Sequence, residues 1–127
     1  MTSPAKGRAL ITGVTGQDGA YLSKFLLDKG YEVFGLLRRS ASADVIGERL
    51  RWLGIFDKVT CVDGDLLDLS SLIRIVQEIR PAESYNLAAQ SFVKTAWAQL
   101  LLTGEVTGLG ATNMLEAVRL GCPEARY

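Results

Sequence analysis

The sequence predicts an α/β fold in which a parallel β-sheet is flanked by helices. Short apolar runs alternate along the chain with stretches whose apolar residues recur at helical spacing. Glycine or proline stands at many of the boundaries between these stretches, which is typical of helix and strand ends. Strands and helices that alternate at this length form parallel sheets with right-handed crossovers. The 127 residues correspond to about one domain.

The predicted elements follow one another in a regular order. In chain order they are strand 7–12, helix 18–29, strand 31–37, helix 44–53, strand 58–63, helix 68–80, strand 83–87 and helix 98–120. Asp44 is the expected N-cap of the second helix, and Asp68 opens the third. Gly30 and Gly54 are expected to end the first two helices. A fifth strand is expected to begin at 125–127.

Two patterns predict how side chains lie in these elements. In the first helix, the apolar side chains of one face are Tyr21, Leu22, Phe25 and Leu26. Cys61 interrupts an apolar strand and is expected to be a buried core residue.

Composition excludes several classes of protein. The net charge is zero, which argues against a nucleic-acid surface that follows phosphates. No apolar run approaches the ~20 residues of a membrane span, and the first residues lack the apolar segment of a signal peptide. Two distant cysteines favour a reducing cytoplasm over a disulfide framework. The chain has no histidine, which excludes a Ser-His-Asp triad and any histidine-ligated metal within it; we expect no metal site.

A three-glycine turn joins the first strand to the first helix. Gly13, Gly16 and Gly19 allow positive φ angles and a close approach of an anion to the backbone. The helix that follows directs its free N–H groups and positive dipole end at that anion. The turn therefore predicts a pyrophosphate site in a Rossmann-like, doubly wound sheet. An ordinary glycine-rich loop is the alternative, whereas a nucleoside-triphosphate loop is excluded because no Gly-Lys-Ser/Thr follows.

Basic residues follow the second strand. In NAD-binding folds a carboxylate at this corner holds the adenosine ribose hydroxyls, but here the chain reads Leu37, Arg38, Arg39, Ser40. A guanidinium can instead bind a 2′-phosphate. A charge-assisted hydrogen bond contributes roughly 1.5–3 kcal/mol, which predicts a preference of one to two decades for NADP over NAD. A solvated basic turn is the alternative.

Two further segments are expected at the same edge of the sheet. After the third strand, Asp65 is a candidate acceptor for the adenine amino group and Leu66 a candidate contact for the ring, with a turn or capping role for Asp65 as the alternative. After the fourth strand, the small residues Ala88 and Ala89 let the backbone pass close to the nicotinamide ribose and the phosphates. The alternative is that small residues occur here only because the end of the strand is tightly packed.

Together these segments resemble the extended short-chain dehydrogenase/reductases and, more narrowly, the GDP-mannose 4,6-dehydratase family. The resemblance rests on TGVTGQDGAYL at 12–22, RRS at 38–40 and YNLAAQSFV at 85–93. It implies a lyase with a tightly held NADP that takes a hydride from C4 of GDP-mannose. Water is then eliminated across C5 and C6, and the hydride returns at C6 to give GDP-4-keto-6-deoxymannose. The cofactor-binding positions it implies are Gly13, Thr15, Gly16, Gln17, Asp18, Gly19, Arg38, Arg39, Ser40, Asp65, Leu66, Leu87, Ala88, Ala89 and Ser91.

The chain also departs from this family. The resemblance places the family's catalytic Tyr-x-x-x-Lys, its Thr/Ser and its glutamate beyond residue 127. None of the four tyrosines in the chain has a lysine four positions later. We therefore expect residues 1–127 to be an incomplete amino-terminal NADP-binding domain, inactive alone, with the catalytic residues and substrate domain outside it. Leu100 replaces the family's usual proline, which makes the start of the last helix uncertain.

Other functions and assemblies fit parts of this pattern. Another NADP-dependent nucleotide-sugar reductase or epimerase, or a non-catalytic NADP-binding protein, is the alternative function. Gly104 and Gly108 lie in a region whose helices pair between subunits in the family, which implies a homo-oligomer, a dimer or a tetramer. Packing of the same helix against the sheet is the alternative.

Overall fold

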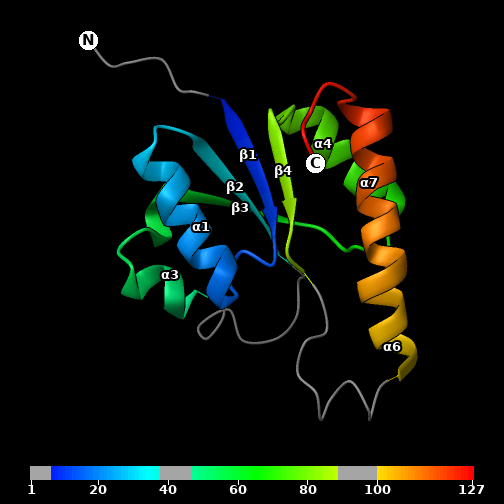
Figure 1. Ribbon diagram of the computed structural model, residues 1–127, viewed down its shortest axis with the longest axis horizontal. Coiled ribbons are helices and arrows are strands. Elements are labelled where there is room, and N and C mark those ends of the chain that lie inside the picture. The colour runs from blue at the N-terminus through cyan, green and yellow to red at the C-terminus, as the bar shows by residue number, and fades with distance from the viewer. Residues whose placement is uncertain (1–6, 38–46, 89–99) are drawn as a thin grey trace.

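A four-stranded parallel sheet forms the centre of the computed structural model, which describes residues 7–37, 47–88 and 100–127 (Figure 1). Its strands are β1 (Arg8–Thr12), β2 (Glu32–Leu37), β3 (Val59–Asp63) and β4 (Glu83–Asn86). Their order is β3-β2-β1-β4, so the chain builds outward from β1 on one side and then returns to its other side. This reversal confirms the doubly wound α/β fold.

The expected fifth strand begins beside β4. Arg126 forms a parallel bridge with Glu83. The Ser84 N–H donates to the Arg126 carbonyl at 2.7 Å, and the Arg126 N–H donates to the Ala82 carbonyl at 2.9 Å. The chain therefore pairs with the sheet where the sequence predicted it.

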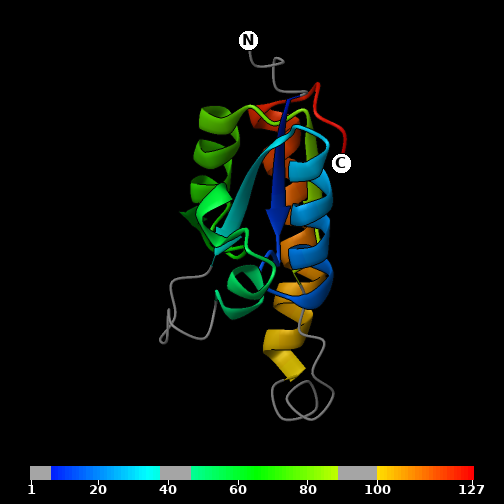
Figure 2. The same ribbon diagram turned by 90° about the vertical axis from the view of Figure 1, so that its left-hand side faces the viewer.

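Helices cover both faces of the sheet. On one face lie α1 (Gln17–Asp28) and α3 (Glu48–Trp52), and on the other lie α4 (Leu69–Ile79) and α7 (Gly110–Gly121) (Figure 1). Figure 2 views the sheet from the side of α1 and α3, with α7 behind it. Adjacent residues of β1 point to opposite faces, so Ile11 packs with the first pair of helices and Leu10 with the second. Both side chains are fully buried, as expected in a parallel sheet covered on both sides.

Several predicted boundaries are confirmed. The structure shows positive φ angles at Gly30 (91°) and Gly54 (74°), just after the helices that each was expected to end. Asp68 caps α4, because its side chain accepts a hydrogen bond from the Ser71 N–H. In the described residues the second helix, α3, begins at Glu48 after the N-cap Gly47, and the expected N-cap Asp44 lies outside them. The turn at Gly47 packs closely on the Phe56 ring, where a Cβ would lie 2.4 Å from it.

The buried face of α1 differs from the predicted one. Its buried residues are Gly19, Ala20, Ser23 and Leu26, whereas Tyr21 and Phe25 are more than half exposed. A buried serine is tolerated because its hydroxyl donates to the Gly19 carbonyl at 2.7 Å. Small residues let α1 approach the sheet more closely than the two aromatic rings would.

The prediction that Cys61 is a buried core residue is wrong, because Cys61 is exposed. It lies on β3, which pairs with β2 alone and so forms an edge of the sheet within the described residues. Partial burial, together with the charge of Asp63, still raises the pKa of the Cys61 thiol.

The last helical segment is not one uninterrupted α-helix. After α6 (Leu100–Gly104), one turn of π-helix, η2 (Glu105–Leu109), precedes α7. Such a wide turn shifts the helical phase of the residues that follow it. α7 then packs Gly110 against Leu66, where a Cβ would lie 3.1 Å from the leucine Cβ, and buries Met114 completely. No described helix is long and apolar enough to span a membrane.

Candidate functional site

The glycine turn lies at the carboxyl end of β1, beside the end of β4. Gly13 has φ of 69°, and its carbonyl accepts a hydrogen bond from the Gly16 N–H at 3.0 Å. A Cβ on Gly13 would lie 2.8 Å from the Ala88 nitrogen, and one on Gly19 would lie 2.2 Å from the Gly13 carbonyl oxygen. Glycine at both positions therefore lets the loop fold tightly onto α1 and onto the chain after β4.

The start of α1 presents backbone N–H groups that no side chain caps. Its N-cap is Gly16, which has no side chain to satisfy the first N–H groups of the helix. Gln17 and Asp18, the first two helical residues, are exposed. A helix of 12 residues directs its positive dipole end to this point. The free N–H groups and the dipole together make this end of α1 suited to a phosphate.

A buried threonine joins the two strand ends at the site. The Thr12 hydroxyl donates to the Asn86 side-chain oxygen at 2.5 Å and accepts from the Ala88 N–H at 3.1 Å. The backbone carbonyl of Thr12 accepts a hydrogen bond from the Leu87 N–H at 3.2 Å. Sequence reasoning did not assign this role to Thr12 or Asn86. The signal available was a polar residue at the last position of each of the two strands, β1 and β4.

The loop after β3 makes its own turn. One carboxylate oxygen of Asp65 accepts a hydrogen bond from the Leu67 N–H at 2.9 Å, which is the turn role that the sequence left open. The Leu66 side chain is 7% exposed and belongs to the core around α4 and α7. Its carbonyl accepts from the Asn113 side-chain amide at 2.8 Å. Only a small edge of Leu66 is thus accessible to a ligand.

The structure brings most of the described candidate residues to one end of the sheet. Those in the glycine turn and those after β4 adjoin each other through Gly13 and Ala88. Asp65 and Leu66 follow the carboxyl end of β3, which is separated from β1 by β2. The candidates that lie outside the described residues are Arg38, Arg39, Ser40, Ala89 and Ser91.

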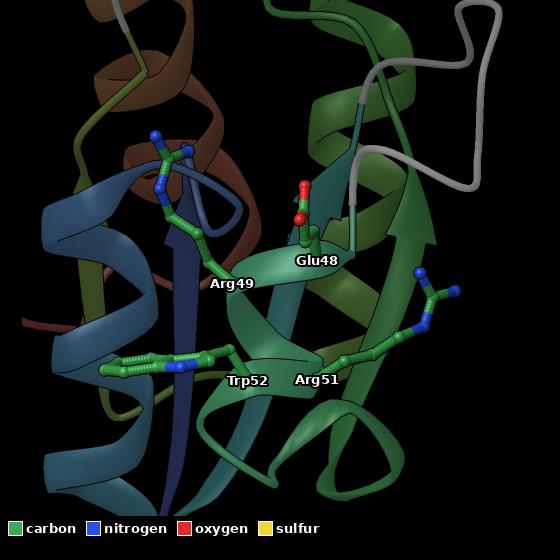
Figure 3. Close-up of a pocket in the computed structure, with 4 residues that line it drawn as sticks. All are labelled: Glu48, Arg49, Arg51 and Trp52. Atoms are coloured by element: carbon green, nitrogen blue, oxygen red, sulfur yellow. The ribbon is translucent and has the colours of Figure 1, made fainter.

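The structure places one further charged residue beside the glycine turn, which the sequence reasoning missed. Arg49 of α3 donates a hydrogen bond from Nη1 to the Thr15 carbonyl at 3.1 Å. Among the described residues, an open surface pocket of about 690 Å³ is lined by Glu48, Arg49, Arg51 and Trp52 (Figure 3). The contact joins residues 34 positions apart, so no local motif could have indicated it.

Tyr85 of β4 is not prepared for proton abstraction. The Tyr85 hydroxyl donates to a Glu83 carboxylate oxygen at 2.7 Å, and this bond, followed by burial, raises the pKa of Tyr85 to about 12. A general base at neutral pH needs a pKa near the working pH. In the described part of the chain, no group of three or more His, Cys, Asp or Glu side chains could hold a metal ion.

Comparison with known proteins identifies the family of this chain. The profile of the family described as GDP-mannose 4,6 dehydratase matches residues 10–126. The human GDP-mannose 4,6 dehydratase is 44% identical over 117 residues, which are 87% of this chain and 31% of that protein. The GDP-mannose 4,6-dehydratase of Vibrio cholerae is 46% identical over 120 residues, 91% of this chain and 32% of the relative. The chain thus spans about a third of the length of these relatives.

Solved structures agree with the fold. The UDP-glucose 4-epimerase of Thermus thermophilus, in complex with NAD, has a TM-score of 0.73 and 32% identity over 88% of this chain and 33% of that one. An epimerase from Methanothermobacter thermautotrophicus has a TM-score of 0.76 and 27% identity, and covers 92% of this chain and 33% of that one.

Proposed function

This chain belongs to the GDP-mannose 4,6-dehydratase family, and from that premise we propose that it forms the NADP-binding part of such an enzyme. The observation that carries the proposal is the glycine turn at the carboxyl end of β1, adjacent to β4. The strand order reverses between these two strands. In open α/β sheets, dinucleotides bind in the crevice at that reversal.

Each part of the proposed site has a separate task. The N–H groups at the start of α1 bind the pyrophosphate, and glycines at 13 and 19 keep the backbone close enough for this contact. The segment after β4, held by Thr12, passes beside the nicotinamide ribose. Asp65 and Leu66 lie on the adenine side, after β3. These assignments support the binding of a dinucleotide as a whole.

The preference for NADP over NAD rests on the sequence after β2. Arg38, Arg39 and Ser40 follow Leu37 at the corner where NAD-binding folds place a carboxylate. A guanidinium there binds the 2′-phosphate and adds roughly 1.5–3 kcal/mol to the binding free energy of NADP. The solved structure of the Thermus epimerase, by contrast, is a complex with NAD.

For the whole protein we propose the conversion of GDP-mannose to GDP-4-keto-6-deoxymannose and water. A bound NADP would supply reversible hydride transfer between C4 and C6, so the reaction would consume no net reductant. This chain holds the cofactor, while proton transfer and sugar binding fall to a catalytic and substrate part outside it. A cytoplasmic location and a homo-oligomeric state belong to the same proposal.

The test measures cofactor affinity by calorimetry on the full-length protein. The wild type is expected to bind NADPH roughly ten- to a hundred-fold more tightly than NADH. Arg38→Ala should remove most of that difference, because the 2′-phosphate loses its guanidinium. Arg119→Ala is the matched control, since Arg119 is an exposed arginine on α7 that pairs with Glu116. Equal affinity for both dinucleotides, unchanged by Arg38→Ala, would overturn the NADP assignment.

A further inference from the structure

We infer that Arg49 is a dinucleotide-binding residue whose guanidinium contacts the pyrophosphate at the glycine turn. The inference rests on the proposed function and adds a residue to its phosphate site. Arg49 comes from α3, a separate element from the strand, turn and helix that form that site.

The position of the guanidinium is fixed by the turn itself. Nη1 of Arg49 lies 3.1 Å from the Thr15 carbonyl oxygen, between Gly13 and Gly16. One hydrogen bond thus anchors the side chain beside the N–H groups that begin α1. Figure 3 shows Arg49 and Arg51 extending from α3 in different directions, with Arg49 directed toward the turn.

The guanidinium keeps donors for a ligand. Arginine has five N–H donors, and the described contact with Thr15 uses one of them. No carboxylate pairs with Arg49 among the residues that the structure describes, although Glu48 precedes it and Asp18 lies in the first turn of α1. Its side chain is exposed and lines both the pocket of about 690 Å³ and a second one of about 240 Å³ next to Gln17. The remaining N–H groups are therefore accessible.

Charge explains which ligand these donors fit. The N-terminus of α1 is the positive end of a helix dipole, and Arg49 brings a full positive charge to the same turn. The exposed Asp18 lies in the same first turn but forms no ion pair with Arg49 among the described residues, so the charge of Arg49 remains available to a bound anion. Guanidinium groups bind phosphate oxygens in a planar, two-pronged geometry. A pyrophosphate on the α1 N–H groups satisfies both the helix dipole and Arg49.

This placement predicts how Arg49 differs from Arg38. A contact with the pyrophosphate is shared by NADP and NAD, whereas a contact with the 2′-phosphate favours NADP alone. Arg49→Ala should therefore weaken NADPH and NADH binding by the same factor. We expect about ten-fold for each, the lower end of a charge-assisted hydrogen bond, because the side chain is exposed.

The experiment is calorimetry of NADPH and NADH with full-length wild type, Arg49→Ala, Arg49→Lys and Arg51→Ala. Arg51→Ala is the matched control, because it removes the same charge from the same helix while Arg51 lies over the Phe56 ring, 4.3 Å from its centroid. Arg49→Lys should recover part of the affinity, since it keeps the charge. A weaker salt dependence of NADH binding in Arg49→Ala than in the wild type identifies a lost phosphate contact, which a purely structural role of Arg49 would not produce.

The outcomes separate the inference from the proposed function. If the wild type binds neither dinucleotide, the proposed function fails. If the wild type binds both and Arg49→Ala binds both equally well, only the inference on Arg49 is overturned. A loss confined to NADPH also overturns it, because that result assigns Arg49 to the 2′-phosphate. If Arg49→Ala unfolds, the affinities of Arg49→Lys for NADPH and for NADH are compared with those of the wild type in the same way.

Discussion

Replacing Gly19 by alanine tests whether close backbone contact shapes the phosphate site. The added Cβ would lie 2.2 Å from the Gly13 carbonyl oxygen, 2.8 Å from the Val14 Cα and 2.9 Å from the Gly13 carbonyl carbon. All three atoms belong to the backbone of the turn, so no side-chain rotation relieves the overlap. Ordinary contact begins at 3.4 Å, and the turn and α1 must therefore separate by 1.2 Å (3.4 minus 2.2).

The expected magnitude combines two opposing terms. Overpacking typically costs about 1–3 kcal/mol, and the upper end applies here because the backbone must move. Alanine gains about 1 kcal/mol over glycine inside a helix. The free energy of unfolding should thus fall by about 2 kcal/mol. The displaced turn also misaligns the N–H groups for the pyrophosphate, so NADPH binding should weaken by at least about ten-fold.

Urea unfolding and calorimetry with NADPH measure these two effects. Gly104→Ala is the control, because a Cβ there meets nothing within 4 Å and Gly104 has helical φ and ψ of −64° and −42°. That variant should be as stable as the wild type or up to about 1 kcal/mol more stable, with unchanged NADPH affinity. The reasoning is refuted if Gly19→Ala unfolds at the wild-type urea concentration and binds NADPH as well as the wild type does.

Two further predictions concern polar contacts at the sheet. Thr12→Val should lower the free energy of unfolding by about 1–3 kcal/mol, because the buried hydroxyl bonded to Asn86 and Ala88 is lost, whereas Thr12→Ser should retain most of the stability in urea unfolding. Tyr85 should titrate near pH 12 by tyrosinate absorbance, and Glu83→Gln should bring its pKa back toward 10. Because the folded pKa is raised, the Tyr85 contribution to stability is complete below pH 10 and is lost as the pH rises from 10 to 12. An ordinary pKa for Tyr85 in the folded wild type contradicts this explanation.

Local features of the sequence determined much of the fold. The alternation of apolar runs with helical periodicity predicted the parallel sheet, and the glycines after the first two helices were correctly placed as their ends. Such features are decided by the steric properties of a few consecutive residues. The same holds for Gly19 in the glycine turn, because a Cβ there would overlap the backbone of Gly13 and Val14.

Tertiary structure decided which surfaces are covered and which distant residues meet. Ser23 is buried in α1 while Phe25 is exposed, because the sheet accepts small residues at that contact. Cys61 is exposed because its strand lies at the edge of the described sheet. The contact of Arg49 with Thr15 depends on how α3 packs beside the turn. The spacing of residues along a chain fixes local conformation, but contacts between distant segments depend on the packing of whole elements.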